Sequence, residues 1–520
     1  MPSVSLNAAM NNHNTMNNLP LYQPSDVATI DRQAMQAMGI DDYKLMRIAA
    51  SSLFRLARQR WPLQRCYTVL VGPGNNGGDG VEVARLAVNA GLGVQLVSVW
   101  SGQQFDNKLK GAAASAWQAW KEAGGSMPAT EIPENPGLII DALFGAGLDR
   151  ALADEWLALV ERCNAIDAPV LAVDAPSGLD GSTGAPWPMA VNADATLCVV
   201  AMKIGLLTGK GPDHCGETYF DDLAVPGSAH DGVKQAARLL DQHSLAALPR
   251  RLSGAHKGDA GQALLAGGAP GMAGAILLAA DSCARSGAGL TRVWTHPDHV
   301  AGLVSARPEA LWQAAGTPLP PLPERITALG IGPGLGRESF GRNLFRHLSA
   351  SDLPTVIDAD GLYWLARGPR PRATLVLTPH PGEAAALLRC AVAEVEADRP
   401  AAVKRLAKEY QAVVVLKGAG TLISDGAQLF VCQHGNPGMA SGGMGDVLTG
   451  LIASLLAQGM PGMEAAYCGV LLHAGAGDLA AGESPIGLLA GDLPALIRQL
   501  RNQPHTLPDG QVRTWRGGAS

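Results

Sequence analysis

The 520-residue sequence lacks any long run of charge of one sign. Its 40 Lys and Arg residues stand against 46 Asp and Glu, which gives a formal net charge of −6 without a block of five or six like charges. Binding to nucleic acid or to an anionic membrane depends on concentrated positive charge. The composition therefore favours neither partner, and we expect small-molecule chemistry instead.

Cysteine pairs and targeting signals are also missing. The eight cysteines are scattered without a C-x-x-C motif, which argues against a zinc site and a disulfide framework, so we expect reduced core residues. No Lys or Arg precedes Arg32, and no apolar segment there has the form of a secretory signal. The most apolar segments are far shorter than the roughly 18 residues of a membrane span. These absences predict a cytoplasmic protein.

The chain is too long for one ordinary core, because single domains usually stop growing near 250 to 300 residues, about half this length. Strand-like apolar runs alternate with helical segments, and the runs are apolar throughout, which is typical of parallel strands covered on both faces. The alternation pauses at 227–251 and then restarts. We therefore predict a disordered Asn-rich tail at 1–20 and two α/β domains at 21–240 and 241–510.

Polar residues follow three apolar runs of the first half. The run "VLV" leads into "GPGNNGGDG", another ends in Asp141, and a third ends in Asp174 before "APSGLD". Ligands of open α/β sheets bind at the carboxyl ends of the strands, so these segments are expected to converge. The side chains concerned are Asn75, Asn76, Asp79, Asp141, Asp174 and Ser177. Taken singly, each loop could equally be a tight turn or a helix cap.

The glycine-rich loop does not have the G-x-G-x-x-G spacing of a dinucleotide fingerprint, and no acidic residue ends the following run. Glycines before a helix nevertheless let backbone N–H groups approach a phosphate. Oxygen donors from Asn76, Asp141 and Ser177 suit a hard cation rather than a soft transition metal. The first half is thus expected to bind an anionic ligand and a cation at one edge.

Together, "GPGNNGGDG", "DALFGAGL" and "AVDAPSGLDGSTG" resemble the NAD(P)H-hydrate epimerase family over roughly 21–226. The resemblance implies a Rossmann-like, parallel three-layer domain that interconverts R- and S-NADHX and NADPHX, hydrates damaged at the nicotinamide ring, with potassium beside the substrate. The implied substrate contacts are Asn75, Asn76, Gly77, Gly78, Asp79, Gly145, Ala146, Gly147, Leu148, Asp149, Arg150, Ala151 and Asp174, and the potassium ligands are Asn76, Asp141 and Ser177. Asp174 is our candidate acid/base group, because epimerisation requires the hydroxyl to leave and return.

One segment departs from that family. Its early helix resembles "LMERAG", whereas this chain has "LMRIAA" from Leu45 to Ala50, with Arg47 in place of a glutamate and Ala50 in place of a glycine. The change could alter dimer packing or a pocket wall. It leaves open the alternative that the first half is a non-catalytic binding module.

A second glycine-rich stretch, "GGMGDVLTG", places Gly445 and Asp446 at the start of an apolar helix. Successive N–H groups there form an anion hole, and the carboxylate suits a base in phosphoryl transfer. The strand end "LKGAGT" offers a second loop, although it is not a Walker A motif, and His380 and Gly334 follow other runs. Each of these features alone could be a structural turn or cap.

Together, "HKGDAGQALLAGG", "GIGPGLG", "LTPHPGEAAAL", "LKGAGT" and "GNPGMASGGMGDVLTG" resemble the ADP-dependent NAD(P)H-hydrate dehydratase family, a ribokinase-like fold, over about 245–500. The resemblance implies nucleotide binding by Lys417, Gly418, Ala419, Gly420, Thr421 and Gly445, and substrate contacts from Ala275, Gly334, His380 and Asp446. Asp446 would help the C6 hydroxyl attack the terminal phosphate of ADP, and loss of phosphate would then restore NAD(P)H and leave AMP. Mg²⁺ would bridge the nucleotide oxygens. Spacing alone supports either ADP or ATP.

The two resemblances describe successive steps on one damaged cofactor. We therefore expect a bifunctional NAD(P)H-hydrate repair enzyme whose partners are NADHX, NADPHX and ADP, and which forms a homo-oligomer. The alternative is a ribokinase-type small-molecule kinase, with a stable phosphorylated product, fused to a non-catalytic Rossmann-like module.

Overall fold

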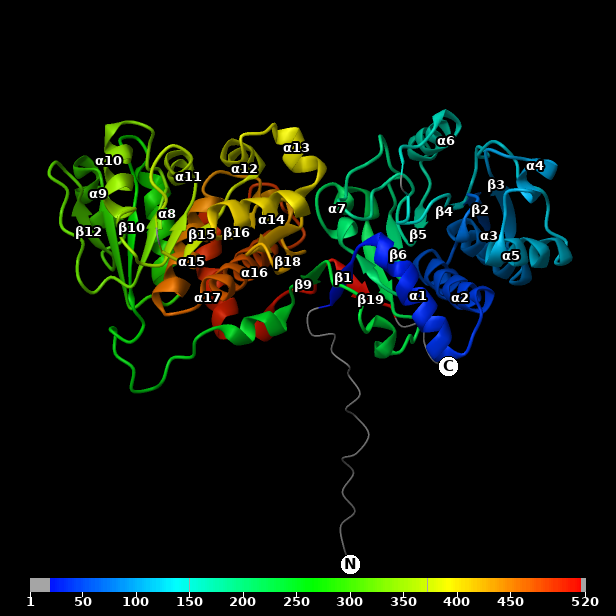
Figure 1. The fold of residues 1–520 in the computed structure, drawn as a ribbon, viewed down its shortest axis with the longest axis horizontal. Coiled ribbons are helices and arrows are strands. Elements are labelled where there is room, and N and C mark those ends of the chain that lie inside the picture. Colours follow the sequence, from blue (N-terminus) through cyan, green and yellow to red (C-terminus); the bar gives the residue numbers. More distant parts are fainter. Residues whose placement is uncertain (1–18, 149, 372, 516–520) are drawn as a thin grey trace, which may run out of the picture.

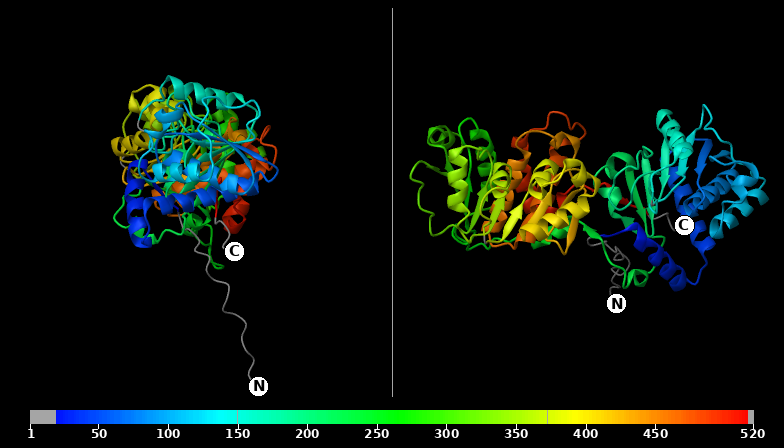
Figure 2. Two further views of the ribbon diagram at one scale, coloured as in Figure 1. Left: turned by 90° about the vertical axis from the view of Figure 1, so that its right-hand side faces the viewer. Right: turned by 45° about the horizontal axis from the view of Figure 1, so that its top comes forward.

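The computed structural model describes residues 19–148, 150–371 and 373–515, which form two lobes side by side (Figures 1 and 2). Of the predicted tail at 1–20, only Leu19 and Pro20 belong to the described residues. All eight cysteines are free, and six of them are buried. No helix among the described residues is long and apolar enough to cross a bilayer.

The first lobe is built on a fully parallel sheet in the order β19-β8-β6-β5-β4-β2-β3. Its strands are β2 (Cys66–Val71), β3 (Gly93–Val97), β4 (Leu138–Ala142), β5 (Val170–Val173), β6 (Ala195–Val199), β8 (Glu217–Asp221) and β19 (Val512–Thr514). The helices are α1 (Pro24–Met38), α2 (Asp42–Arg60), α3 (Asn75–Asn89), α4 (Gly102–Asp106), α5 (Gly111–Glu122), α6 (Asp154–Ala165) and α7 (Gly211–Cys215), with 3-10 turns η1 (Ile204–Leu207) and η2 (Gly227–His230). One core joins the sheet to α2, α3 and α5, and another joins it to α6. The predicted parallel three-layer α/β arrangement is confirmed.

The second lobe holds a 12-stranded sheet of the described residues, in the order β12-β11-β10-β13-β14-β15-β16-β17-β18-β9-β1-β7. Its strands are β10 (Gln262–Ala266), β11 (Leu290–Thr295), β12 (Leu311–Ala314), β13 (Ala328–Ile331), β14 (Thr355–Ile357), β15 (Leu375–Leu377), β16 (Val413–Leu416), β17 (Thr421–Ser424) and β18 (Leu429–Cys432), with β1 (Pro20–Tyr22), β7 (Met202–Lys203) and β9 (Ala237–Leu239). β12 through β16 pair in parallel, whereas β16, β17 and β18 form an antiparallel meander. The α/β class with a mainly parallel sheet is confirmed here too.

Helices cover both faces of this second sheet. They are α8 (Ala273–Arg285), α9 (Val300–Ala306), α10 (Ser339–Leu348), α11 (Asp360–Leu365), α12 (Pro381–Leu388), α13 (Val392–Ala397), α14 (Arg399–Tyr410), α15 (Met444–Ala457), α16 (Gly462–Ala481) and α17 (Leu493–Asn502). The short 3-10 turns are η3 (Gln242–Ala247), η4 (Pro297–His299), η5 (Pro437–Met439), η6 (Ala490–Asp492) and η7 (Pro504–Thr506). Along β10, Leu264 belongs to the core with α10 to α14, and Leu265 belongs to the core with α8, α15, α16 and α17. Successive strand residues therefore anchor opposite helical layers, because side chains alternate across a sheet.

Short strands from the first half complete the second sheet. β9 pairs with β18, β1 pairs with β9, and β7 pairs with β1 at the far edge. In the opposite direction, β19 near the end of the chain pairs with β8 in the first lobe. Figure 1 shows β1, β9 and β19 between the two lobes. The lobes are therefore joined by exchanged strands and not only by a linker.

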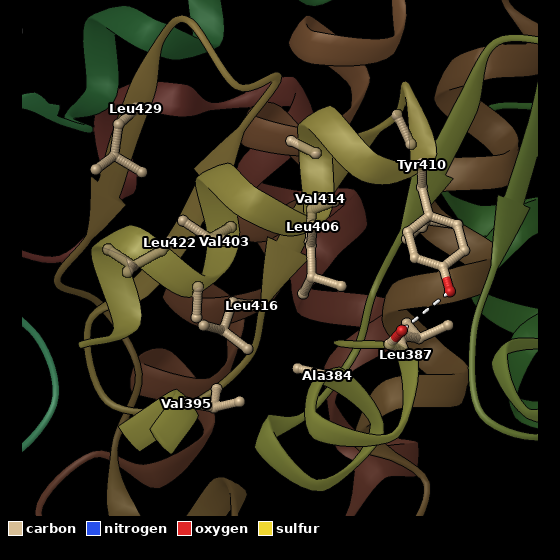
Figure 3. Close-up of a cluster of buried hydrophobic side chains, with 14 of the residues drawn as sticks. Ala384, Leu387, Val395, Val403, Leu406, Tyr410, Val414, Leu416, Leu422 and Leu429 are labelled. Atoms are coloured by element: carbon tan, nitrogen blue, oxygen red, sulfur yellow. Dashed lines mark hydrogen bonds between the residues drawn. The ribbon is translucent and has the colours of Figure 1, made fainter. Parts of the chain in front are cut away.

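A compact apolar cluster positions the loop that follows β16 (Figure 3). Leu406 of α14, Val414 of β16 and Ala384 of α12 belong to it, and the hydroxyl of Tyr410 donates to the Leu387 carbonyl at 3.2 Å. This packing fixes α12 and α14 against the sheet. The residues that follow β16 consequently leave the sheet from a rigid base.

Arg399, at the start of α14, lies between the lobes and is only 2% exposed. Its guanidinium donates to the Lys417 carbonyl at 3.1 Å and to the hydroxyl of Thr208, which follows η1 in the first lobe, at 3.4 Å. The Thr208 hydroxyl in turn donates to the Gly420 carbonyl at 3.0 Å. Burial lowers the pKa of Arg399, and only Glu396 opposes that effect. The guanidinium thus connects the strand-end loop of one lobe to the other lobe.

Replacing Arg399 by Met keeps the length of the side chain but removes its donors. We expect Arg399→Met to lower the free energy of unfolding by about 1–3 kcal/mol, because buried carbonyls lose their partners. Urea unfolding measures the change. Arg405→Met on the same helix is the matched control, since Arg405 is exposed and, among the described residues, donates to the Leu388 carbonyl alone. Equal losses in the two variants would contradict the bridging role.

Candidate active sites

The first candidate site is a cavity of about 470 Å³ at the carboxyl end of the first sheet. The segments around it are the start of α1, the loop after β2, the loop after β4, the end of β5 and the end of β7. Its lining includes Asn75, Asn76, Asp79, Gly145, Ala146, Gly147, Leu148, Arg150 and Asp174. The convergence expected from the sequence therefore brings most of the predicted substrate contacts to one cavity.

The glycines of the loop after β2 pack against different parts of the structure. A Cβ on Gly72 would lie 1.7 Å from the Leu143 carbonyl oxygen, so no side chain fits where the two loops touch. Gly77 packs on Gly72, and Gly78 packs on Met46 of α2. The structure does not bring Gly77, Gly78 or the exposed Ala151 to the cavity lining, and Asp149 lies outside the described residues.

A buried lysine contributes a positive charge to this cavity. Lys203, the last residue of β7, is 2% exposed and forms an ion pair with Asp174. Asp174 follows β5 with a left-handed φ of 65°, a strained backbone for a residue with a side chain. Burial alone would lower the pKa of Lys203, but the Asp174 carboxylate raises it above its usual value. The lysine therefore stays charged inside the cavity.

Two further carboxyl groups share the cavity. Burial raises the pKa of Asp31 on α1 to about 6, with Lys203 opposing the shift and Asp174 adding to it. Burial, with the Asp174 and Asp31 charges added, raises the pKa of Asp79 well above its usual value. Sequence reasoning missed Lys203 and Asp31. Lys203 ends an apolar run, which was a usable signal, whereas nothing in the pattern of α1 singles out Asp31.

Asp141 and Ser177 lie together beneath the loop after β4. The Ser177 hydroxyl donates to Asp141 at 2.6 Å, and its backbone N–H donates to the same carboxylate at 2.7 Å. The Phe144 carbonyl lies 3.1 Å from that hydroxyl. Burial raises the pKa of Asp141 to about 6, although the Ser177 hydrogen bonds oppose the shift. The amide nitrogen of Asn76 is buried without a hydrogen-bond partner among the described residues.

The segment "LMRIAA" lies in α2, away from the cavity lining. Arg47 is half-exposed and its Nε lies 3.5 Å from the carboxylate of Glu82, which is 1% exposed. Arg85 binds the same carboxylate at 2.6 Å. Ala50 is part of the core between α2, α3 and α5. The residues that depart from the family pattern therefore lie where α2 packs on α3, and none of them lines the cavity.

The second candidate site lies at the start of α15. Asp446 is in the first turn of the helix, after Gly443 with a φ of 93°. Burial raises the pKa of Asp446 to about 7, with the Asp358 carboxylate adding to the shift and Lys417 opposing it. His473 of α16 supports the same turn, since its Nε2 lies 3.0 Å from the Met444 carbonyl. Asp446 is therefore a carboxyl group that can hold or release a proton near neutral pH.

Lys417 and Asp358 form the ion pair of this site. The Lys417 Nζ lies 2.7 Å from Asp358 Oδ1 and 3.7 Å from Glu383 Oε2. Thr449 of α15 donates to the other Asp358 oxygen at 3.0 Å. Burial alone would raise the pKa of Asp358, but the Lys417 charge lowers it; conversely, Asp358 raises the pKa of Lys417 against the effect of burial.

Gly445 and His380 lie near this pair, whereas Ala275 and Gly334 contact each other. Lys417 to Thr421 turn between the antiparallel β16 and β17, and a Cβ on Gly445 would lie 3.3 Å from the Lys417 Nζ. His380 caps α12 beside Glu383, at 3.5 Å between Nε2 and Oε1. Ala275 and Gly334 touch each other, with 3.1 Å between the Ala275 Cβ and a Cβ built on Gly334. Sequence reasoning missed Asp358, although it follows β14 in the same way that Asp174 follows β5.

The first candidate site offers oxygen donors for a cation. Asp141, Ser177 and the Phe144 carbonyl provide a buried carboxylate and neutral oxygens, with no cationic side chain paired to that carboxylate among the described residues, which fits a hard cation. Within the described ranges, no three His, Cys, Asp or Glu side chains form a metal-binding group. A divalent ion in the second site would accordingly depend on oxygens of its ligand.

Comparison with known proteins divides the chain in the same way. The family model described as "YjeF-related protein N-terminus" matches residues 42–205, and the model described as "NAD(P)H-hydrate dehydratase" matches residues 263–499. Among solved structures, the ADP/ATP-dependent NAD(P)H-hydrate dehydratase of Bacillus subtilis, co-crystallised with ATP and Mg²⁺, is 32% identical with a TM-score of 0.48 and covers 51% of this chain and 97% of its own.

Full-length relatives cover both lobes. Bifunctional NAD(P)H-hydrate repair enzymes named Nnr are 42% identical in Vibrio cholerae, over 92% of this chain and 98% of the relative, and 41% identical in Escherichia coli K12, over 93% and 94%. The bifunctional NAD(P)H-hydrate repair enzyme of Leishmania major is 36% identical over 87% of this chain and 88% of its own.

The environment of Asp446 predicts a pH-dependent stability. Below pH 3.8 the Asp446 carboxyl group is protonated in both the folded and the unfolded chain. Between pH 3.8 and about 7 only the folded chain keeps this proton, so the free energy of unfolding falls as the pH rises through this range. We expect Asp446→Asn to be more stable than the parent by about 1–3 kcal/mol at pH 8 and no different near pH 4. Urea unfolding across this range measures it, with exposed Asp352→Asn as the control. A difference independent of pH would contradict the desolvated carboxyl group.

Proposed function

Because the chain belongs to the family of bifunctional NAD(P)H-hydrate repair enzymes, we propose that its two sites perform successive steps on the hydrated cofactors NADHX and NADPHX. The family predicted from the sequence motifs is confirmed. The first lobe interconverts the R and S forms, and the second lobe dehydrates the S form at the expense of ADP. The observation that carries the second assignment is Asp446, with a pKa of about 7 at the start of α15 and beside Lys417.

In the first lobe, we assign the acid/base chemistry to carboxyl groups around Lys203. The protonated Asp79 donates a proton to the departing C6 hydroxyl, which leaves as water while the ring nitrogen lone pair stabilises the cationic ring. Asp174 was the candidate acid/base group from the sequence; because its carboxylate is ion-paired with Lys203 beside this cavity, we propose instead that it balances the positive ring, and the proton transfer is assigned to Asp79. Water then returns on either face and gives its proton back to Asp79. The raised pKa of Asp79 supports its protonated starting state.

We assign the potassium ligands to Asn76, Asp141 and Ser177. The support is the buried Asp141 carboxylate, whose pKa burial raises to about 6 and which has no cationic partner among the described residues. The unpartnered amide of Asn76 also shows that its orientation in the loop after β2 is not fixed by a protein acceptor. A bound potassium ion would supply fixed positive charge beside the substrate.

In the second lobe, Asp446 accepts the proton of the C6 hydroxyl as that oxygen attacks the terminal phosphorus of ADP. AMP departs, and the phosphorylated hydrate then loses phosphate from C6 and a proton from C5, which restores the double bond of NAD(P)H. Hydroxide is a poor leaving group and phosphate is a good one, which is why the phosphoryl step precedes elimination. The N–H groups at the start of α15 and the ammonium of Lys417 attract the nucleotide phosphates.

The remaining predicted residues are assigned around these steps. The loop Lys417 to Thr421 and Gly445 hold the nucleotide, while Ala275, Gly334 and His380 contact the hydrate. Mg²⁺ would be held chiefly by the phosphate oxygens and would neutralise their charge during transfer. A cytoplasmic location, the domain limits 21–240 and 241–510, and a homo-oligomer stay predictions; the free cysteines support a reducing compartment.

Recovery of reduced cofactor tests the whole assignment. Incubation with mixed R- and S-NADHX and ADP is expected to convert both forms to NADH, with release of AMP and phosphate and faster turnover than with ATP. Asp446→Ala is expected to lower this recovery at least 100-fold while R and S forms still interconvert, and Asp352→Ala is the control. Accumulation of a stable phosphorylated hydrate would identify a kinase instead. Recovery at the parental rate in Asp446→Ala would refute the assigned base.

Pure R-NADHX tests the first lobe separately. We expect Lys203→Met and Asp79→Asn to slow the conversion of R to S by about 100-fold or more, because they remove the charge and the proton that the cavity supplies. Dehydration of S-NADHX by the same variants is the internal folding control, and Lys210→Met, at an exposed lysine, is the matched substitution. Unchanged conversion of the R form in both cavity variants would show that the first lobe acts otherwise.

A further inference from the structure

The second lobe contains a cavity of about 570 Å³ that lies outside both candidate active sites. Its walls are the carboxyl-terminal half of α8, the end of α17, the segment around Arg251 and the segment that follows α9. Ala275, a predicted substrate contact, lies near the other end of α8. The α8 residues that line the cavity begin at Ala280, about 7.5 Å along the helix axis from Ala275 at a rise of about 1.5 Å per residue, and the cavity lining includes neither Asp446 nor Lys417.

Guanidinium groups dominate the lining. Five arginines reach the cavity, Arg251, Arg285, Arg307, Arg498 and Arg501, and the acidic residues there are Asp281 and Glu309. Arg285 and Arg307 share one carboxylate, since both bind Asp281 Oδ1, at 2.9 and 2.8 Å. The lining therefore carries excess positive charge even though the whole chain is acidic.

Three of the guanidinium groups have no carboxylate partner among the described residues. Arg251 donates to the Gly287 carbonyl at 2.6 Å, and Arg501 donates to the side-chain oxygen of Gln458 at 2.5 Å and to the Pro249 carbonyl at 3.4 Å. Arg498 is exposed and has no side-chain partner in the described part of the chain. Neutral acceptors orient these groups without balancing their charge.

Arg501 is the most constrained of the three. Its Nε is buried without a hydrogen-bond partner among the described residues. A Cβ on Gly287 would lie 3.2 Å from its guanidinium carbon, so the glycine leaves room for the charged group. Burial, with the Arg251 charge added, lowers the pKa of Arg501. A desolvated cation without a counter-ion is costly, and an anion in the cavity would remove that cost.

We propose that this cavity binds a small polyanion, a molecule that carries a diphosphate or an equivalent pair of phosphate charges. Guanidinium groups bind phosphate oxygens through paired N–H donors, and Arg251, Arg498 and Arg501 offer such donors from two different segments. The volume falls within the range of small-ligand sites, which is about 300 to 1,000 Å³. Nucleotides and inorganic pyrophosphate share the required chemistry.

One sequence motif supports the assembly of this end of the lobe. The stretch "HKGDAG" packs on the turn after α8 and does not lie at the catalytic edge, because the N–H of Gly289 donates to the Ala260 carbonyl at 3.0 Å. A Cβ on Gly289 would lie 1.8 Å from the Lys257 carbonyl oxygen. The loop thus holds the Ser286 to Gly289 turn, and with it Gly287, in place beside Arg501.

Inorganic pyrophosphate is the probe for this site, and ADP and AMP are the second arm. We compare the parent, Arg251→Gln/Arg498→Gln and Arg342→Gln/Arg346→Gln by isothermal titration calorimetry at low salt. The last double variant removes two exposed arginines of α10, so it changes the net charge equally. Binding at the catalytic loops is common to all three proteins, so a difference between the variants reports on the cavity.

The proposal predicts that Arg251→Gln/Arg498→Gln loses one class of pyrophosphate sites or weakens it at least tenfold, while the α10 variant binds like the parent. A matching loss of ADP but not AMP binding would identify a nucleotide diphosphate as the ligand. Dehydration of S-NADHX with ADP, in the absence of pyrophosphate, shows that each variant is folded. Equal binding by the two variants, or no binding by the parent, would overturn the proposal. A smaller particle in gel filtration, without any change in pyrophosphate binding, would overturn it in favour of a contact between copies of the chain.

Discussion

The charge of one largely buried lysine organises each candidate site, and the carboxyl groups near it differ in pKa according to whether they pair with that lysine. Lys203 pairs with Asp174, and Lys417 pairs with Asp358. An ion pair inside a protein is favourable only when both charges stay compensated, so neither partner is free to change protonation easily. The carboxyl groups nearby that lack such a partner have raised pKa values, as Asp79 and Asp446 do. In both lobes the fixed charge and the movable proton are therefore on different residues.

Lys203 and Lys417 are also connected by a short segment of the chain and a few hydrogen bonds. Lys203 leads directly into η1, and Thr208, just beyond it, donates to the Gly420 carbonyl in the loop that begins at Lys417. Arg399 donates to the Thr208 hydroxyl on one side and to the Lys417 carbonyl on the other. Buried hydrogen bonds therefore connect the segment after β7 to the loop from Lys417 to Thr421. The exchanged strands make this connection part of a continuous sheet.

Much of both sites follows from one rule, that ligands meet the carboxyl ends of parallel strands. The rule located the loop after β2, Asp141 and Asp174 in one lobe, and the loop after β16 in the other. It would also have found Asp358 and Lys203, which end or follow strands in the same way. Asp31 could not be predicted by this rule, because it lies on α1 and reaches the cavity only through tertiary packing. The exchange of β1, β7, β9 and β19 was equally hidden, since segments of two or three residues carry no periodic signal.

The altered helix "LMRIAA" shows how a departure from a family pattern can be judged by its contacts. A positive charge at Arg47 would be unfavourable against an apolar face, but here it lies beside the buried carboxylate of Glu82, which Arg85 also binds. The carboxylate needs cationic neighbours because it is almost fully desolvated. Arg47 of the altered helix therefore helps to balance the negative charge of Glu82 on α3. Neither Arg47 nor Glu82 lines the cavity of the first candidate site.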